Sequence, residues 1–137
     1  MIQMAFQFRL RTVLKVRQLE RDQQRQVVSN ARACLTKVVA DRDRLVDGRM
    51  IVIDELRRLN DSEVWDINHV LDRQRHTAQL GQALAATEFT LTKAKTQLEA
   101  AITRLVEADQ LVKALERISE RQLAEYEVSQ LKLAALE

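Results

Sequence analysis

The chain has 137 residues, of which 31% are charged and 4% aromatic, with no proline, two glycines and a formal net charge of +2. Ala, Leu, Glu, Gln, Lys and Arg dominate, which is typical of long helices or coiled coils, and so few large side chains exclude a compact core of many layers. Cys34 is the only cysteine, so an internal disulfide is excluded as well.

The first predicted element is a helix over about residues 9–59. A strict heptad that starts at Leu10 places mostly apolar side chains on one seam of this helix. Polar residues interrupt the seam at Arg17, Arg21, Gln24, Arg42 and Arg49. Polar seam residues weaken helix pairing but can fix its register, and the alternative, which stays open at this point, is a helical end that frays into water.

The second predicted element is a bend over residues 60–69, NDSEVWDINH. Asn60, Asp61 and Ser62 are turn and helix-capping residues, and Asp61 or Ser62 is expected to accept hydrogen bonds from the free backbone N–H groups that start a helix. A short helical turn is expected over residues 62–69. Trp65 is the only tryptophan, and we interpret its ring as a cap on the core more than as a binding residue.

The third predicted element is a helix over about residues 70–134. Its heptad is almost unbroken from Leu80 to Leu115 and continues, with more polar residues, to Leu136. Leu98 lies in the part of this seam that should pack best. Together the elements predict an all-α fold: a long antiparallel two-helix coiled coil, or helical hairpin, that forms a single domain over residues 1–137 and is monomeric.

The charges favour the same antiparallel arrangement. Basic residues outnumber acidic ones near the N-terminus, whereas the C-terminal end is mildly acidic. Folding back would bring the two arms together, with Arg17 and Arg21 near Ser119, Glu120 and Gln122. Ion pairs between residues four apart, Asp54 with Arg58 and Asp109 with Lys113, are expected as ordinary supports of the helices.

No catalytic, cofactor or metal site is predicted. Gly48 and Gly81 each stand alone in a helical pattern, whereas a phosphate-binding loop needs clustered glycines. His69 and His76 share a helical face but lack the further ligands that zinc requires. A two-helix fold offers no cleft for a nucleophile and its base, so we expect no enzyme.

Nucleic-acid binding and membrane insertion are not expected either. Acidic residues interrupt the basic stretch of residues 9–32, which indicates a solvated helix face more than a phosphate-binding surface. No segment has the length and apolarity of a membrane span or a secretion signal. We therefore expect a cytoplasmic protein.

Two stretches resemble the flagellar export protein family FliJ. The opening FQFRLRTVLKVRQLERDQ is similar to the family's start, and VKALERISERQLAEY, over residues 112–126, is similar to a stretch near its end. The chain departs from many members at Trp65 in the bend and over the weakly hydrophobic residues 72–77. The opening match includes Phe6, Phe8, Arg9, Leu10, Val13, Leu14 and Arg17.

The resemblance implies a non-enzymatic role in the flagellar type III protein export apparatus, needed for motility. The family is similar to the central stalk of rotary ATPases, so the coiled coil would insert in the hexameric export ATPase. It would also contact the cytoplasmic domain of the membrane export gate and handle export chaperones. The protein would then be cytoplasmic and peripherally located at the membrane-bound apparatus.

Two sets of residues are candidates for these contacts. The export-gate set lies near the bend: Trp65, Val70, His76 and Leu80. The ATPase-binding set lies at the terminal end: Phe6, Phe8, Arg9, Arg11, Lys15, Arg17, Arg21, Glu116 and Glu120. Phe6 and Phe8 could instead pack against Tyr126 and the last leucines.

Two other readings remain. The first is the related stalk protein of a virulence type III secretion system, which would have the same architecture. The second is a dimeric coiled-coil scaffold without an ATPase partner, in which the helices would pair between chains.

Overall fold

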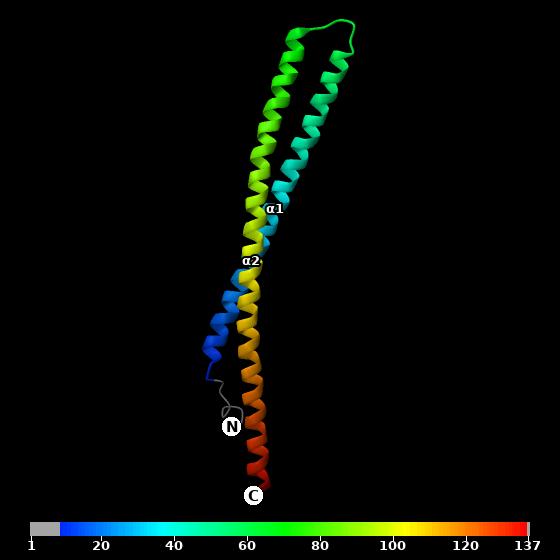
Figure 1. The fold of residues 1–137 in the computed structure, drawn as a ribbon. Coiled ribbons are helices and arrows are strands. Elements are labelled where there is room, and N and C mark those ends of the chain that lie inside the picture. The colour runs from blue at the N-terminus through cyan, green and yellow to red at the C-terminus, as the bar shows by residue number, and fades with distance from the viewer. Residues whose placement is uncertain (1–8, 137) are drawn as a thin grey trace. The chain divides into compact units, whose positions relative to one another are not determined.

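The computed structural model describes residues 9–136 and consists of two α-helices (Figure 1). Helix α1 spans Arg11–Asn60 and helix α2 spans Ile67–Leu136, and no strand occurs in the described part of the chain. The predicted all-α class and the helical hairpin are confirmed. Helix α1 starts two residues later than predicted, and α2 starts three residues earlier and ends two residues later.

Packing divides the chain into two units. The terminal unit comprises Met1–Ser29 and Ala100–Glu137, and the connection unit comprises Asn30–Glu99 with the segment that joins the helices. In each unit one stretch of α1 packs against one stretch of α2.

The core is a narrow seam made of small and medium-sized apolar side chains. The buried residues are Val28, Val38, Val52, Val70, Leu91, Ala94, Ala101 and Val112. All but Val70 occupy positions of the two predicted heptads, and Val70 extends the second heptad towards the start of α2. Because a two-stranded seam buries only two positions per heptad, each of these residues carries a large share of the core.

Several polar seam residues are only half-buried. Arg17, Arg21, Gln24, Arg42 and Arg49 all have intermediate exposure, as the heptad predicts for residues on the seam. Their long side chains place apolar stems on the seam while the polar ends reach towards solvent. The first part of α1 is therefore helical and packed, although its seam is polar.

Contacts between α1 and α2 define the register within each unit. In the connection unit Arg73 Nη1 donates to Glu55 Oε2 at 3.3 Å, and a Cβ added at Gly81 would lie 3.5 Å from Nη2 of Arg49. In the terminal unit the charges of Arg21 and Arg25 act on Asp109.

The predicted neighbours of Arg21 are therefore wrong. Arg21 lies close to Asp109, about three helical turns before the expected Ser119–Gln122. Folding back about the bend pairs residues whose numbers add to about 129, as Arg49 with Gly81 and Glu55 with Arg73 do, and this places Arg21 close to Asp109. Helix α2 has 70 residues and α1 has 50, so the last turns of α2 extend beyond the start of α1 (Figure 1).

The connection starts α2 with a different cap from the predicted one. Asp66 Oδ1 accepts hydrogen bonds from the backbone N–H groups of Asn68 at 3.1 Å and His69 at 3.3 Å. Ser62 Oγ instead donates to the carbonyl of Val64 at 3.1 Å, and residues 61–64 form a turn and bends. The predicted helical turn over residues 62–69 is wrong, because capping by Asp66 delays the helix to Ile67.

Local ion pairs support both helices. Lys113 and Asp109 pair at 2.9 Å, as predicted. Asp54 pairs with Arg57 at 3.6 Å, not with the predicted Arg58, because a partner three residues along also lies on the same helical face.

The seam should be sensitive to a single charge. Leu91, 3% exposed, is a better test position than the half-buried Leu98. We expect Leu91→Asp to lower the free energy of unfolding by about 3 kcal/mol or more, because it removes a buried side chain and buries an unpaired carboxylate. Gln97→Asp, on the exposed face, is the control. Equal denaturant midpoints for the two variants would contradict the seam.

The cap can be tested separately. We expect Asp66→Ala to lower the free energy of unfolding by about 1 kcal/mol, since two backbone N–H groups lose their acceptor. Ser62→Ala should change it much less, because Ser62 does not accept from the first turn of α2. Chemical denaturation of both variants measures the difference, and a larger effect of Ser62→Ala would show that the helix is capped elsewhere.

Candidate functional site

The first candidate surface is the basic arm of the terminal unit. Arg9, Arg11 and Lys15 are exposed and make no ion pair with another described residue. Arg17 pairs with Glu20 at 2.9 Å and Arg21 with Asp22 at 3.4 Å, both within α1. The available positive charge therefore lies in the first two turns of α1 and just before them.

The two carboxylates predicted for this surface differ in exposure. Glu120 is exposed, whereas Glu116 is half-buried beside the seam. A third carboxylate, Asp109, accepts a hydrogen bond from Lys113, and this bond together with the charges of Lys113, Arg21 and Arg25 lowers the pKa of Asp109. Asp109 thus stays ionised at neutral pH, and its stabilising contacts are lost as the pH falls through this lowered pKa.

The end of α2 carries exposed apolar side chains that were not predicted. Leu131, Leu133 and Leu136 are 71%, 58% and 84% exposed. The heptad placed Leu133 and Leu136 on the seam, but the register leaves α1 no helical residue opposite them. The second predicted helix is longer than the first, and this difference in length already indicates that the end of α2 has no helical partner. Phe6 and Phe8 lie outside the described residues.

The second candidate surface surrounds the connection. Val64, Trp65, Ile67 and Leu71 are all substantially exposed, and Trp65 is 55% exposed. Trp65 Nε1 donates to the carbonyl of Asn60 at 3.5 Å, so the ring contacts the end of α1 without being buried in a core.

The four residues predicted for the gate do not share one exposed face. Val70 is 5% exposed and packs in the seam, and His76 and Leu80 are half-buried. Only Trp65 offers most of its surface to a partner. Val64, Ile67 and Leu71 were not predicted as site residues, although these apolar residues lie in or beside the predicted bend.

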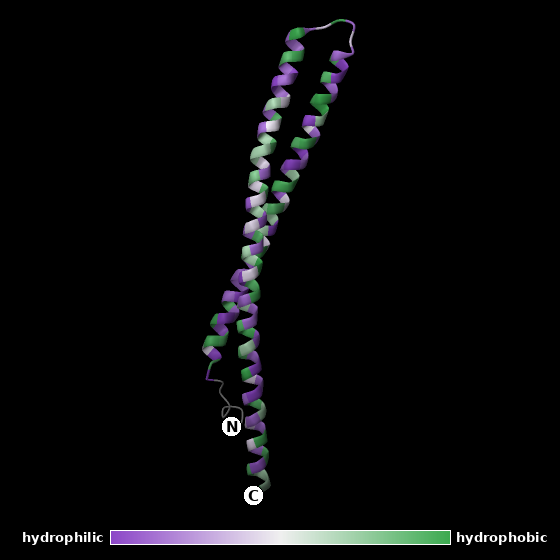
Figure 2. Ribbon diagram, in the orientation of Figure 1, coloured by the Kyte–Doolittle hydropathy of each residue, from purple (hydrophilic) through white to green (hydrophobic). Residues whose placement is uncertain are grey.

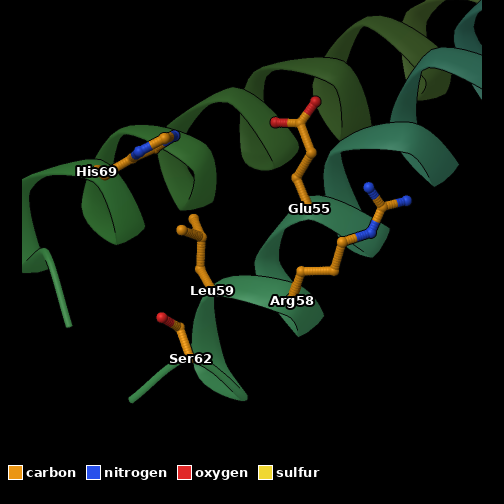
Figure 3. Close-up of a pocket in the computed structure, with 5 residues that line it drawn as sticks. All are labelled: Glu55, Arg58, Leu59, Ser62 and His69. Atoms are coloured by element: carbon orange, nitrogen blue, oxygen red, sulfur yellow. The ribbon is translucent and has the colours of Figure 1, made fainter. Parts of the chain in front are cut away.

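A shallow pocket of about 380 Å³ opens beside this surface (Figure 3). Glu55, Arg58 and Leu59 contribute from α1, Ser62 follows that helix, and His69 lies on α2. Its apolar wall is Leu59, and its polar groups are of both signs. The arrangement suits a mixed polar and apolar side chain of a partner protein more than a small ionic ligand.

An ion-pair network lies next to the pocket. Arg73 bonds Asp72 at 2.8 Å and bridges to Glu55 on the other helix at 3.3 Å. The hydrogen bond from Arg73 is the main cause that lowers the pKa of Asp72, and the charges of Arg73, His69 and His76 lower it further. The network fixes the end of α1 against the start of α2 and so holds the connection surface in place.

The described side chains do not form a metal centre. Within residues 9–136, no group of three or more His, Cys, Asp or Glu side chains could hold a metal ion. Cys34 is exposed on α1. Neither described helix contains a window apolar enough to cross a membrane.

Comparison with known proteins finds one solved structure that is similar to this chain. No model of a known family matches the chain, and no curated protein matches it. A solved structure of CT670 from Chlamydia trachomatis, proposed to be a homolog of YscO, is similar with a TM-score of 0.59. The two are 21% identical, and the match covers 95% of this chain and 86% of CT670. The likeness shows a shared fold over almost the whole chain.

Proposed function

We propose that the chain is a non-enzymatic stalk protein of a type III protein export apparatus. The observation that carries the proposal is the shared fold with the YscO-like CT670 over 95% of the chain. The resemblance of the opening residues to the FliJ family supports the same class. A paired-helix protein with a narrow seam and charged faces suits a stalk, which works by contact and not by chemistry.

The terminal unit is the part that we propose enters the hexameric export ATPase. Arg9, Arg11 and Lys15 offer positive charge that no described carboxylate neutralises. The last turns of α2 add exposed leucines beyond the start of α1. Charges that complement a ring wall would steer entry, and the leucines would add contact area once the stalk is inside.

The connection surface is the proposed contact for the cytoplasmic domain of the export gate. Trp65 supplies an exposed aromatic anchor, and Val64, Ile67 and Leu71 surround it with apolar area. Aromatic anchors commonly dominate binding energy at protein interfaces. His76 and Leu80 would contribute their exposed edges, while Val70 would support the surface from the seam. Export chaperones remain further proposed partners.

The flagellar apparatus is the first candidate within this class, because the opening motif resembles FliJ. A YscO-type secretion system is the second, favoured by the structural likeness. Deletion of the gene separates them. Loss of motility and of flagellar subunits in the medium supports the first, and normal motility with loss of other exported proteins supports the second. In either case the protein would act in the cytoplasm, peripherally at the membrane-bound apparatus.

A charge reversal tests the ATPase contact. We expect Arg9→Glu, Arg11→Glu and Lys15→Glu together to reduce stimulation of the purified export ATPase about tenfold or more, because several weak exposed contacts act jointly. Stimulation by the unaltered chain should fall as salt rises, since salt screens exposed charges. Rates of ATP hydrolysis measured against chain concentration give the effect.

The control reverses three exposed cations of the connection unit, Arg32, Lys37 and Lys93. This variant should stimulate normally, and both variants should keep their helical circular dichroism. Binding of the gate's cytoplasmic domain should survive the terminal reversal and weaken in Trp65→Ala. Full stimulation by the folded terminal variant would show that this arm is only a solvated helix face.

A further inference from the structure

One flank of α1 in the connection unit is apolar and open to solvent. It consists of Val39, Val46, Met50 and Ile53, which follow one another along the face next to the seam. Val46 and Met50 are 42% and 54% exposed, and the other two are half-buried. An apolar face of three positions per heptad, where a two-stranded seam needs two, is typical of helices in larger bundles.

The apolar flank is confined to this part of α1. The equivalent heptad positions closer to the N-terminus are the polar residues Gln18, Arg25 and Arg32. The position that follows Ile53 is Asn60, the last residue of the helix. The flank therefore spans about four turns, or roughly 20 Å, which is long enough to pack against another helix.

Helix α2 presents small residues on the same side. Gly81 marks this side, because the guanidinium of Arg49 reaches from the seam of α1 and lies over it. Ala78 and Ala85, one turn away in either direction, are exposed. Thr92 is exposed as well, and its hydroxyl donates to the carbonyl of Glu88 at 3.1 Å. Figure 2 shows this stretch of α2 mostly in white and green.

Two opposite charges on this side lack partners. The side chains of Arg49 and Glu88 make no ion pair or hydrogen bond with another residue of the described chain, and Nε of Arg49 is buried without an acceptor. Other arginines of α1, such as Arg42, pair with a neighbouring aspartate. Glu88 lies seven residues beyond Gly81, about 10 Å along α2, so Arg49 is too far away to pair with it in the same chain.

We propose that this side of the connection unit binds a second copy of the chain. A twofold axis that crosses the helices midway between Gly81 and Glu88 places Arg49 of each copy opposite Glu88 of the other. The apolar flanks meet around that axis, and the small residues of α2 allow close approach. A symmetric interface of this kind needs one self-complementary patch, which the flank and its two unpaired charges supply. Each hairpin stays intact, unlike in a scaffold whose helices pair between chains.

Sedimentation equilibrium of the purified chain tests the proposal. We expect a concentration-dependent dimer that weakens as salt rises. Glu88→Arg should raise the dissociation constant about tenfold, because like charges then face each other. The double variant Arg49→Glu with Glu88→Arg should restore dimerisation, because the opposite charges are exchanged. Met50→Glu should abolish it, and Lys93→Glu, on the opposite face of α2, should leave it unchanged.

Position 49 is half-buried, so Arg49→Glu can disturb the seam and prevent dimerisation by the double variant. Cross-linking therefore provides a second test. In a Cys34→Ser background, Ala85→Cys lies close to the proposed axis and should form a disulfide-linked dimer under mild oxidation. Ala86→Cys points to the other side of α2 and should not. A monomer at all concentrations, or equal cross-linking at both positions, would overturn the proposal and leave the flank to a helix of another protein.

Discussion

The narrowness of the seam between α1 and α2 governs everything else in this structure. With only two core positions per heptad, the buried residues of the described chain are five valines, two alanines and one leucine. Such a seam presents long faces in a fixed register, and the candidate surfaces lie on these faces and at the ends of the helices.

The polar residues of the seam fix the register of α1 against α2 within each unit. Arg21 beside Asp109 and Arg49 beside Gly81 give each unit a contact that a shifted register would lose. The network of Arg73, Glu55 and Asp72 does the same close to the connection. The register then decides which residues are left over: the end of α2, the ring of Trp65 with its apolar neighbours, and the apolar flank around Met50.

Periodicity predicted the fold well because burial along a helix follows a fixed repeat, and the positions from Leu14 to Leu59 that the heptad selected are buried or half-buried. It failed where geometry depends on a few local bonds. Capping by Asp66 and not Ser62 shifted the start of α2 by three residues, and the position of Arg21 beside Asp109 follows from folding back about the bend and not from the distribution of charge. Candidate site residues were found by type, but Val70 proved buried, because the second heptad, extended back from Leu80, places it on the seam.

The candidate surfaces therefore depend on the register of α1 against α2, and paired cysteines test this register most directly. Val28 and Ala101 are 4% and 3% exposed in the terminal unit, and the register places them on the same layer of the seam. In a Cys34→Ser background, Val28→Cys with Ala101→Cys should form an intrachain disulfide under mild oxidation, seen by mass spectrometry of the digested monomer. Val28→Cys with Ala108→Cys, one heptad away, should stay reduced. Cross-linking of the second pair and not the first would contradict the register and the surfaces that depend on it.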